Sequence, residues 1–264
     1  MGQFIFSENF PKNLEPLVNL DKKSFDYYML HVLFDIGGAV IDKQNRKGST
    51  IIDDSYWEKF KKAEEYLKQM NSIADIGPTY LRYIDDIMGV LELENTNPCS
   101  IATTKICNML KITDSTEAQI VLQTLQSQEP NVRAILEQEL TATGIDDDKA
   151  ILLYYAPATM RNAITYFKNN NSENPIVDGL NIVLPTFARI YSQTRANLAK
   201  KDDAPNVTTV MISNIAKKAG ENPNELSKSN IELQSVGNDF EASISPVHQI
   251  NNTQSTKFPR GSGR

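Results

Sequence analysis

The chain has 264 residues, of which 40% are hydrophobic and 23% are charged, and its formal net charge is −6 at pH 7. This length supports one large domain or two small ones, with a hydrophobic core that holds without disulfides or metals. The composition is typical of a globular protein, and no apolar stretch is long enough to cross a membrane.

The cysteines and the N-terminal segment indicate an intracellular protein. Cys99 and Cys107 are eight residues apart in a predicted helix, a separation of about 12 Å along its axis, which is too long for a disulfide. Two reduced thiols are therefore expected, as in a reducing compartment. The N-terminal segment lacks a basic stretch followed by an apolar one, so no secretory signal is predicted.

The charge is divided unevenly along the chain. Residues 1–150 contain 15 Lys and Arg against 24 Asp and Glu, whereas residues 151–264 contain 12 against 9. A basic segment attracts a polyanion locally even when the whole chain is acidic, because screening limits the attraction to about 10 Å. A solvated helix face is the commoner meaning of such a segment, so charge alone does not decide the function.

Helical periodicity organises the first part of the chain. Residues 1–23 show no period and are predicted to form an extended arm, whereas residues 24–41 place apolar side chains at helical spacing. Ser55 and Glu58 have the spacing of a capping box at the start of the next helix. Gly77-Pro78 is expected to end that helix.

Shorter helical segments follow. Asp114 has the position of an N-cap and Pro130 that of a first-turn proline. The predicted helices cover residues 80–93, 101–110, 117–125, 130–140, 146–155, 185–198 and 208–219.

The end of the chain loses this periodicity. From residue 228 onward apolar residues become sparse, and residues 228–264 are predicted to form a flexible tail. No strand-like alternation of useful length is apparent. The predicted class is therefore all-α, with a single helical core domain over residues 24–227 between the N-terminal arm, residues 1–23, and the tail.

One short segment resembles an enzyme motif. Leu33 to Asp42 is similar to the first motif of haloacid-dehalogenase-type phosphohydrolases, in which an aspartate at the end of a buried strand attacks phosphorus. Asp35 would be that nucleophile. The chemistry also needs a hydroxyl, a lysine and a metal-binding acid pair on further strands, and no β-α-β series is predicted to carry them. A phosphohydrolase that uses Asp35 is the third alternative.

Other catalytic or metal-binding patterns are incomplete. Tyr83-Ile84-Asp85-Asp86 resembles the metal-binding signature of reverse transcriptases, but its surroundings are helical, and Asp85-Asp86 is interpreted as a solvated helix edge. His31 and His248 are the only histidines, and they lie in an apolar helix and in the predicted tail. Neither a metal cluster nor a Ser/His/Asp arrangement is predicted, so no catalytic residue, metal or cofactor is expected.

Three segments, taken in order, resemble coat proteins of flexuous filamentous plant RNA viruses of the potyvirus and potexvirus types. The first, Leu91–Ser100, is similar to a helix end and turn of those proteins. The second is Pro175–Val177 followed by Pro185–Ile190, and the third is Asn238–Ala242. About 75 residues separate the first segment from the second, more than in those families.

The resemblance implies that a serine, an arginine and an aspartate meet in an RNA groove. Arg189 would fork onto a phosphate, and the base sequence would not be read because only the backbone is contacted. With the neighbouring bases included, the predicted RNA-binding residues are Ser100, Arg189, Arg195, Lys200, Lys201 and Asp239.

The first hypothesis is therefore a non-enzymatic coat or nucleocapsid-type protein. It would polymerise by self-association into a helical filament around single-stranded RNA, in the virion and the host cytoplasm, without a membrane or a small-molecule substrate. The alternative from another class is a helical protein-interaction module or effector that binds no nucleic acid.

Overall fold

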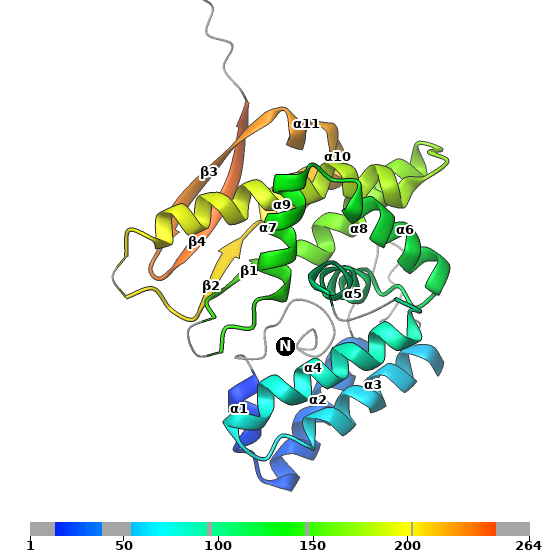
Figure 1. The fold of residues 1–264 in the computed structure, drawn as a ribbon, viewed down its shortest axis with the longest axis vertical. Helices are drawn as coiled ribbons and strands as arrows, with labels where there is room; N and C mark the ends of the chain where they lie inside the picture. The colour runs from blue at the N-terminus through cyan, green and yellow to red at the C-terminus, as the bar shows by residue number, and fades with distance from the viewer. Residues whose placement is uncertain (1–13, 39–53, 94–96, 146–147, 202, 247–264) are drawn as a thin grey trace, which may run out of the picture.

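The computed structural model describes residues 14–38, 54–93, 97–145, 148–201 and 203–246. Within these ranges the fold is mostly helical and contains a four-stranded sheet. The predicted all-α class is therefore right for most elements and wrong for the sheet. Helices α1 to α4 form one end of the molecule, and the sheet lies toward the opposite end (Figure 1).

The N-terminal end is a small helical layer with its own core. Its elements are α1 (Glu15–Val18), α2 (Lys22–Gly38), α3 (Asp54–Leu67) and α4 (Ile73–Val90). Their buried side chains form one cluster of Leu14, Phe25, Met29, Val32, Phe60, Leu67, Met70 and Ile76. The predicted helix over residues 24–41 corresponds to α2. The second half of the predicted arm is helical as well, and residues 1–13 lie outside the described residues.

Helix α4 continues through Gly77-Pro78, where the sequence predicted a break. An interior proline costs about 3 kcal/mol. Burial offsets this cost, since each large apolar side chain contributes roughly 1.5–3 kcal/mol and α4 buries Ile76, Thr79, Tyr83, Ile84, Ile87 and Met88. A capping box of Ser72 and Asp75 fixes the start of α4. Helix α3 begins at Asp54, one residue before the predicted N-cap Ser55.

Three helices connect the N-terminal layer to the sheet. They are α5 (Pro98–Leu110), α6 (Ser115–Gln126) and α7 (Pro130–Thr141). The Asp114 carboxylate accepts a hydrogen bond of 2.9 Å from the Glu117 amide, which confirms the predicted N-cap, and Pro130 occupies the first turn of α7 as predicted.

Four helices accompany the sheet: α8 (Ala156–Asn169), α9 (Pro175–Leu198), α10 (Ser213–Glu221) and α11 (Asn224–Ser227). A Cβ on Gly179 would lie 2.8 Å from Ile164 Cγ1, so the close approach of α8 and α9 requires glycine there. Pro185, the predicted helix start, lies inside α9, which begins ten residues earlier at Pro175. In Figure 1, α9 crosses in front of the sheet.

The sheet has the strand order β1-β2-β4-β3. Its strands are β1 (Ala150–Tyr154), β2 (Val207–Met211), β3 (Ser229–Val236) and β4 (Asp239–Pro246). The pairs β1–β2 and β2–β4 are parallel, and β3–β4 is an antiparallel hairpin. Two-residue hairpin turns favour glycine at the first central position, and here Gly237 has a φ of 62°.

The four strands contradict three predictions made from the sequence. Residues 150–154 form β1 rather than a helix, and residues 207–211 form β2 before α10 begins. Residues 229–246 form the β3–β4 hairpin rather than a flexible tail; the rest of the predicted tail, residues 247–264, lies outside the described residues. Across the ranges that the structure describes, no helix is long and apolar enough to cross a membrane.

Candidate functional site

Ser100 lies in the first turn of α5 and is buried. Its backbone amide donates a hydrogen bond of 2.9 Å to the Asn97 side-chain oxygen, which is the N-cap of that helix. Its carbonyl accepts a hydrogen bond of 2.8 Å from the Thr104 hydroxyl. Ser100 therefore belongs to the start of a packed helix.

Arg189 joins α9 to the segment that leads into the hairpin. Its guanidinium donates hydrogen bonds of 2.9 Å to the Ser229 carbonyl and 2.5 Å to the Leu226 carbonyl. Partial burial lowers the pKa of Arg189 below its ordinary value because it removes water from the charged group. Peptide carbonyls, rather than an open groove, hold this guanidinium.

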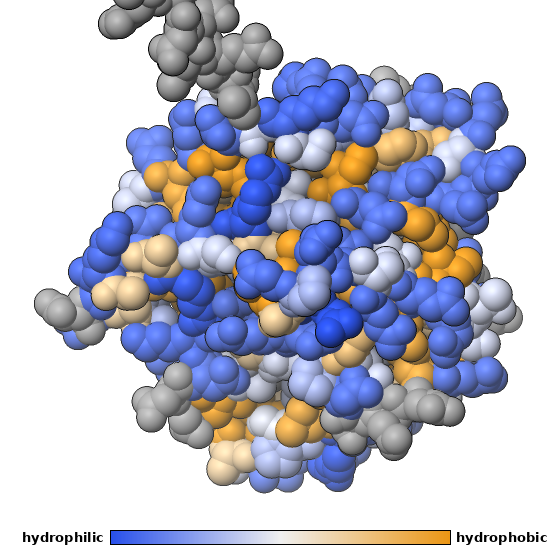
Figure 2. Space-filling model, turned by 45° about the horizontal axis from the view of Figure 1, so that its top comes forward, coloured by the Kyte–Doolittle hydropathy of each residue, from blue (hydrophilic) through white to orange (hydrophobic). Residues whose placement is uncertain are grey.

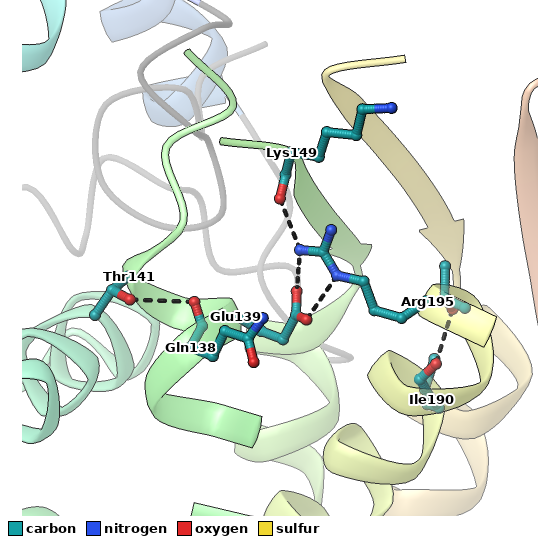
Figure 3. Close-up of polar contacts among 7 residues, drawn as sticks. Gln138, Glu139, Thr141, Lys149, Ile190 and Arg195 are labelled. Atoms are coloured by element: carbon teal, nitrogen blue, oxygen red, sulfur yellow. Dashed lines mark hydrogen bonds and ion pairs between the residues drawn. The ribbon is translucent and has the colours of Figure 1, made fainter. Parts of the chain in front are cut away.

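Arg195 joins α9 to α7 and to the start of β1 (Figure 3). Its Nε and one terminal nitrogen each lie 2.8 Å from a Glu139 carboxylate oxygen, in the bidentate geometry of a strong charge-assisted pair. The same terminal nitrogen donates to the Lys149 carbonyl at 2.6 Å. The hydrogen bonds to the Glu139 carboxylate, together with its negative charge, raise the pKa of Arg195. Because the Glu139 side chain is only 3% exposed, the pair is a structural clamp.

Lys201 and Asp239 also hold the hairpin. The Lys201 ammonium lies 4.7 Å from the centre of the Phe240 ring, and Phe240 is a buried residue of β4. The Asp239 carboxylate accepts a hydrogen bond of 2.8 Å from the Thr209 amide of β2. Lys200, by contrast, is exposed. Together with Arg189, these contacts tie the hairpin to the end of α9 and to β2.

Five of the six predicted RNA-binding residues therefore occupy three different places, and the sixth, Lys200, is exposed just after the end of α9. Ser100 is at the start of α5, Arg195 is in the clamp to α7, and Arg189, Lys201 and Asp239 serve the hairpin. The described contacts do not gather them into one groove. RNA binding itself stays a prediction.

The motifs that resemble enzymes also have structural explanations. Asp35 lies within α2 and not at the end of a strand, as a phosphohydrolase nucleophile would. Asp86 accepts a hydrogen bond of 2.6 Å from the Tyr66 hydroxyl and pairs with Lys62 at 2.9 Å, and these contacts lower its pKa. Among the described residues, no group of three or more His, Cys, Asp or Glu side chains is placed to hold a metal ion.

A buried lysine in α5 is a further titratable group that the sequence did not indicate. Lys105 is 6% exposed, and burial lowers its pKa to about 8. Its ammonium lies 5.9 Å from the centre of the Tyr80 ring, and the Asp148 charge partly opposes the pKa shift. This environment fits a core lysine that lies near an aromatic ring.

The outer face of α2 is the clearest surface for a partner. Phe25, Met29 and Val32 face the N-terminal core. On the other side, Tyr27, Leu30 and Phe34 are 64%, 45% and 67% exposed. This aromatic stripe, as we call Tyr27, Leu30 and Phe34, has the i, i+3, i+7 spacing of one helix face. The sequence contains these residues as apolar positions on a different side of the helix from Phe25, Met29 and Val32.

Charged side chains border one end of the aromatic stripe. A hollow of about 480 Å³ is lined by Lys22, Lys23, Asp26, Tyr27 and Leu30. Lys22 and Asp26 pair across one helical turn at 2.7 Å, and the described contacts include no partner for Lys23 other than through its backbone amide. The site combines an apolar centre with a cationic end.

Figure 2 shows how apolar residues are distributed on one face of the molecule. There apolar residues lie in several small groups that are separated by hydrophilic ones. Scattered exposed apolar residues are normal on protein surfaces, whereas aligned large ones mark contact sites. Tyr27, Leu30 and Phe34 on α2 are such an aligned set.

Comparison with known proteins identifies a protein family. The model of a family of unknown function (DUF6829) matches residues 1–224. No curated protein and no solved structure matches the chain. The matched range includes α2 and α9 and ends before the β3–β4 hairpin begins at Ser229.

Proposed function

The chain belongs to the family of unknown function DUF6829, and we propose that it is a protein-interaction module that pairs with a second copy of itself through the outer face of α2. The observation that carries the proposal is the exposure of Tyr27, Leu30 and Phe34 on one helix face. Burying the exposed parts of these side chains in a contact favours association, and it offsets part of the entropy that two proteins lose when they associate.

The spacing of the aromatic stripe is compatible with a two-fold symmetric contact between two α2 helices. Lys23, Tyr27, Leu30 and Phe34 follow the alternating four-three-four spacing of a coiled-coil seam. If two α2 helices pack antiparallel about an axis between Leu30 and His31, Tyr27 of one copy faces Phe34 of the other. The rings of Tyr27 and Phe34 then pack against each other, and both copies use the same surface, which makes the contact isologous.

The helix ends favour the same antiparallel arrangement. The first turn of α2 contains no acidic residue, and its last turn contains no basic residue. The axis that pairs Tyr27 with Phe34 sets Lys23 beside Gly38 of the other copy. The lysine would then meet the negative end of the partner's helix dipole, a favourable contact.

Coating of single-stranded RNA is the competing proposal. RNA coating also requires self-association. Fewer cations are available to bind phosphate, however, because Arg189 and Arg195 each donate three hydrogen bonds within the chain. A coat also requires a contact that does not close, so that subunits add without limit. The α2 contact closes in a dimer.

Sedimentation velocity over a range of protein concentrations tests the proposal. We expect a dimer with a Kd on the order of 1–100 μM. Leu30→Lys should weaken it more than about tenfold, because two ammonium groups would face each other across the axis. The matched control is Leu81→Lys in α4, since Leu81 is 48% exposed and Leu30 45%.

Three results would contradict the α2 dimer. One is a monomeric wild-type protein across the whole range. Another is an equal loss of dimer in Leu30→Lys and Leu81→Lys, which would indicate a general charge effect. The third, large particles with the ultraviolet absorbance of nucleic acid, would support RNA coating instead.

A further inference from the structure

The helices that accompany the sheet pack against one of its two faces. Ile151, Leu153, Val210, Phe240 and Ala242 belong to the main core together with residues of α8, α9 and α10. Because side chains alternate along a strand, their neighbours point to the opposite side. We call that side the outer face of the sheet.

Ala142 covers only one part of the outer face. It forms a small separate cluster with Ala150, Leu152 and Val207. Further along β1 and β2, Tyr154 is 41% exposed and Met211 is half-buried. The free part of the face therefore lies toward the carboxyl ends of the parallel strands.

The strand register places four side chains in one row across this face. Tyr154 pairs with Met211, Met211 with Glu241, and Glu241 with Gln234. Neighbouring strands are about 4.8 Å apart, so Tyr154 and Glu241 are separated by about 10 Å across the sheet. The row leads from an aromatic ring over a thioether to a carboxylate.

The outer face is acidic. It carries Glu232, Asp239 and Glu241, and none of the four strands contains a lysine or an arginine. Asp239 accepts from the Thr209 amide and Glu232 accepts from the Ser245 hydroxyl. Among the described contacts, Glu241 has no hydrogen bond or ion pair from its side chain. It is the carboxylate on this face that is left to meet a cation.

A second aromatic ring stands at the end of the row. Tyr155 follows β1 with a φ of 86°, a left-handed conformation that bulky residues rarely adopt. Its ring lies edge-to-face against Tyr154, with ring centres 4.8 Å apart. Both rings are about 40% exposed, at 41% and 40%. Tyrosine rings attract lysine and arginine groups through their faces.

We infer that the outer face of the sheet binds a basic, extended segment of a partner protein. The aliphatic stem of a lysine or arginine crosses Met211, while Glu241 takes the cationic head of one side chain and Tyr154 that of another. The complementary charge selects this occupant, since the carboxylates repel RNA and acidic peptides. The inference is independent of the α2 dimer.

The test uses a fluorescently labelled peptide of alternating arginine and serine as the probe. Fluorescence anisotropy at low salt measures its affinity for the full chain and its variants. Glu241→Lys should weaken binding about tenfold, since it replaces an attraction by a repulsion. The matched control is Glu173→Lys, the same charge change at an exposed residue between α8 and α9; its affinity should change less than about twofold.

The contribution of Tyr154 to probe binding is tested separately. Tyr154→Ala should weaken the probe about threefold to fivefold, whereas Tyr27→Ala in α2 should leave the affinity unchanged. Absence of probe binding to the wild-type protein would overturn the inference. So would equal weakening by Glu241→Lys and Glu173→Lys, which would indicate attraction to the net charge of −6 rather than to this face.

Discussion

Helix α9 turns its arginines inward, whereas α2 turns aromatic side chains outward. Arg189 and Arg195 bind carbonyl and carboxylate oxygens of the same chain. Tyr27, Leu30 and Phe34 face solvent although each is large and apolar. Residue type alone therefore does not determine which side chains are available to a partner. In this protein the arginines predicted to bind RNA stabilise the fold, and the apolar residues of an N-terminal helix are available for contact.

Of the substitutions considered, removal of Arg195, which pairs with the buried Glu139, should destabilise the protein most. Arg195→Ala leaves the buried Glu139 carboxylate without its bidentate partner, and we expect the free energy of unfolding to fall by about 3 kcal/mol. Urea denaturation measures the loss. Arg133→Ala is the control, because Arg133 pairs with Glu137 at 3.6 Å on the surface and should cost less than about 1 kcal/mol. Equal losses would show that the Arg195 pair is not a structural clamp.

Removing the arginine that holds the hairpin should have a smaller and more local effect. Arg189→Ala takes the donor away from the Leu226 and Ser229 carbonyls, which should cost about 1–3 kcal/mol. Hydrogen exchange should accelerate in β3 and β4 more than in α4. Unchanged exchange in the hairpin, with RNA binding lost, would instead favour the predicted RNA groove.

The buried Lys105 of α5 should make the stability of the protein depend on pH. Because the pKa of Lys105 is lowered to about 8, the unfolded chain binds its proton more tightly up to about pH 10. This residue therefore makes stability rise with pH from about 8 to about 10. Lys105→Met should remove that contribution and, at neutral pH, stabilise the protein on the order of 1 kcal/mol. Parallel pH profiles of the variant and the wild-type protein would contradict the assignment.

The contact between Lys201 and Phe240 should matter least. At a partly exposed site a cation over an aromatic ring contributes about 0.5–1 kcal/mol. Lys201→Ala should lower the urea midpoint slightly, and Lys200→Ala should not change it, since Lys200 is exposed. An equal effect of both substitutions would indicate net charge rather than the ring contact.

The sequence was a good guide to helices that carry local signals. The Asp114 cap and Pro130 in a first turn are local features, and both are confirmed. The strands were missed for two reasons. β1 is a short apolar run, which periodicity alone does not distinguish from a buried helix. In the hairpin, Ile231, Leu233, Phe240 and Ala242 do alternate with polar residues, and Gly237-Asn238 lies between them, but the polar outer face resembled a tail.

The candidate site was harder to predict than the helices. The partners of Arg189 lie about 40 residues away in sequence, and Glu139 lies 56 residues before Arg195. Such pairs depend on how helices and strands pack, and no single segment contains them. The aromatic stripe was visible as Tyr27, Leu30 and Phe34. Only the packed structure shows which of the two apolar faces of α2 the core covers.

Cross-linking between copies tests whether α2 forms an antiparallel dimer. One protein carries Tyr27→Cys and the other Phe34→Cys, and the two are mixed under mild oxidation; Cys107 is buried and Cys99 half-buried, so background reaction should be low. The antiparallel α2 dimer predicts that mixed disulfide dimers exceed those formed by either protein alone. Absence of cross-linked dimers, or formation of only same-variant dimers, would contradict it.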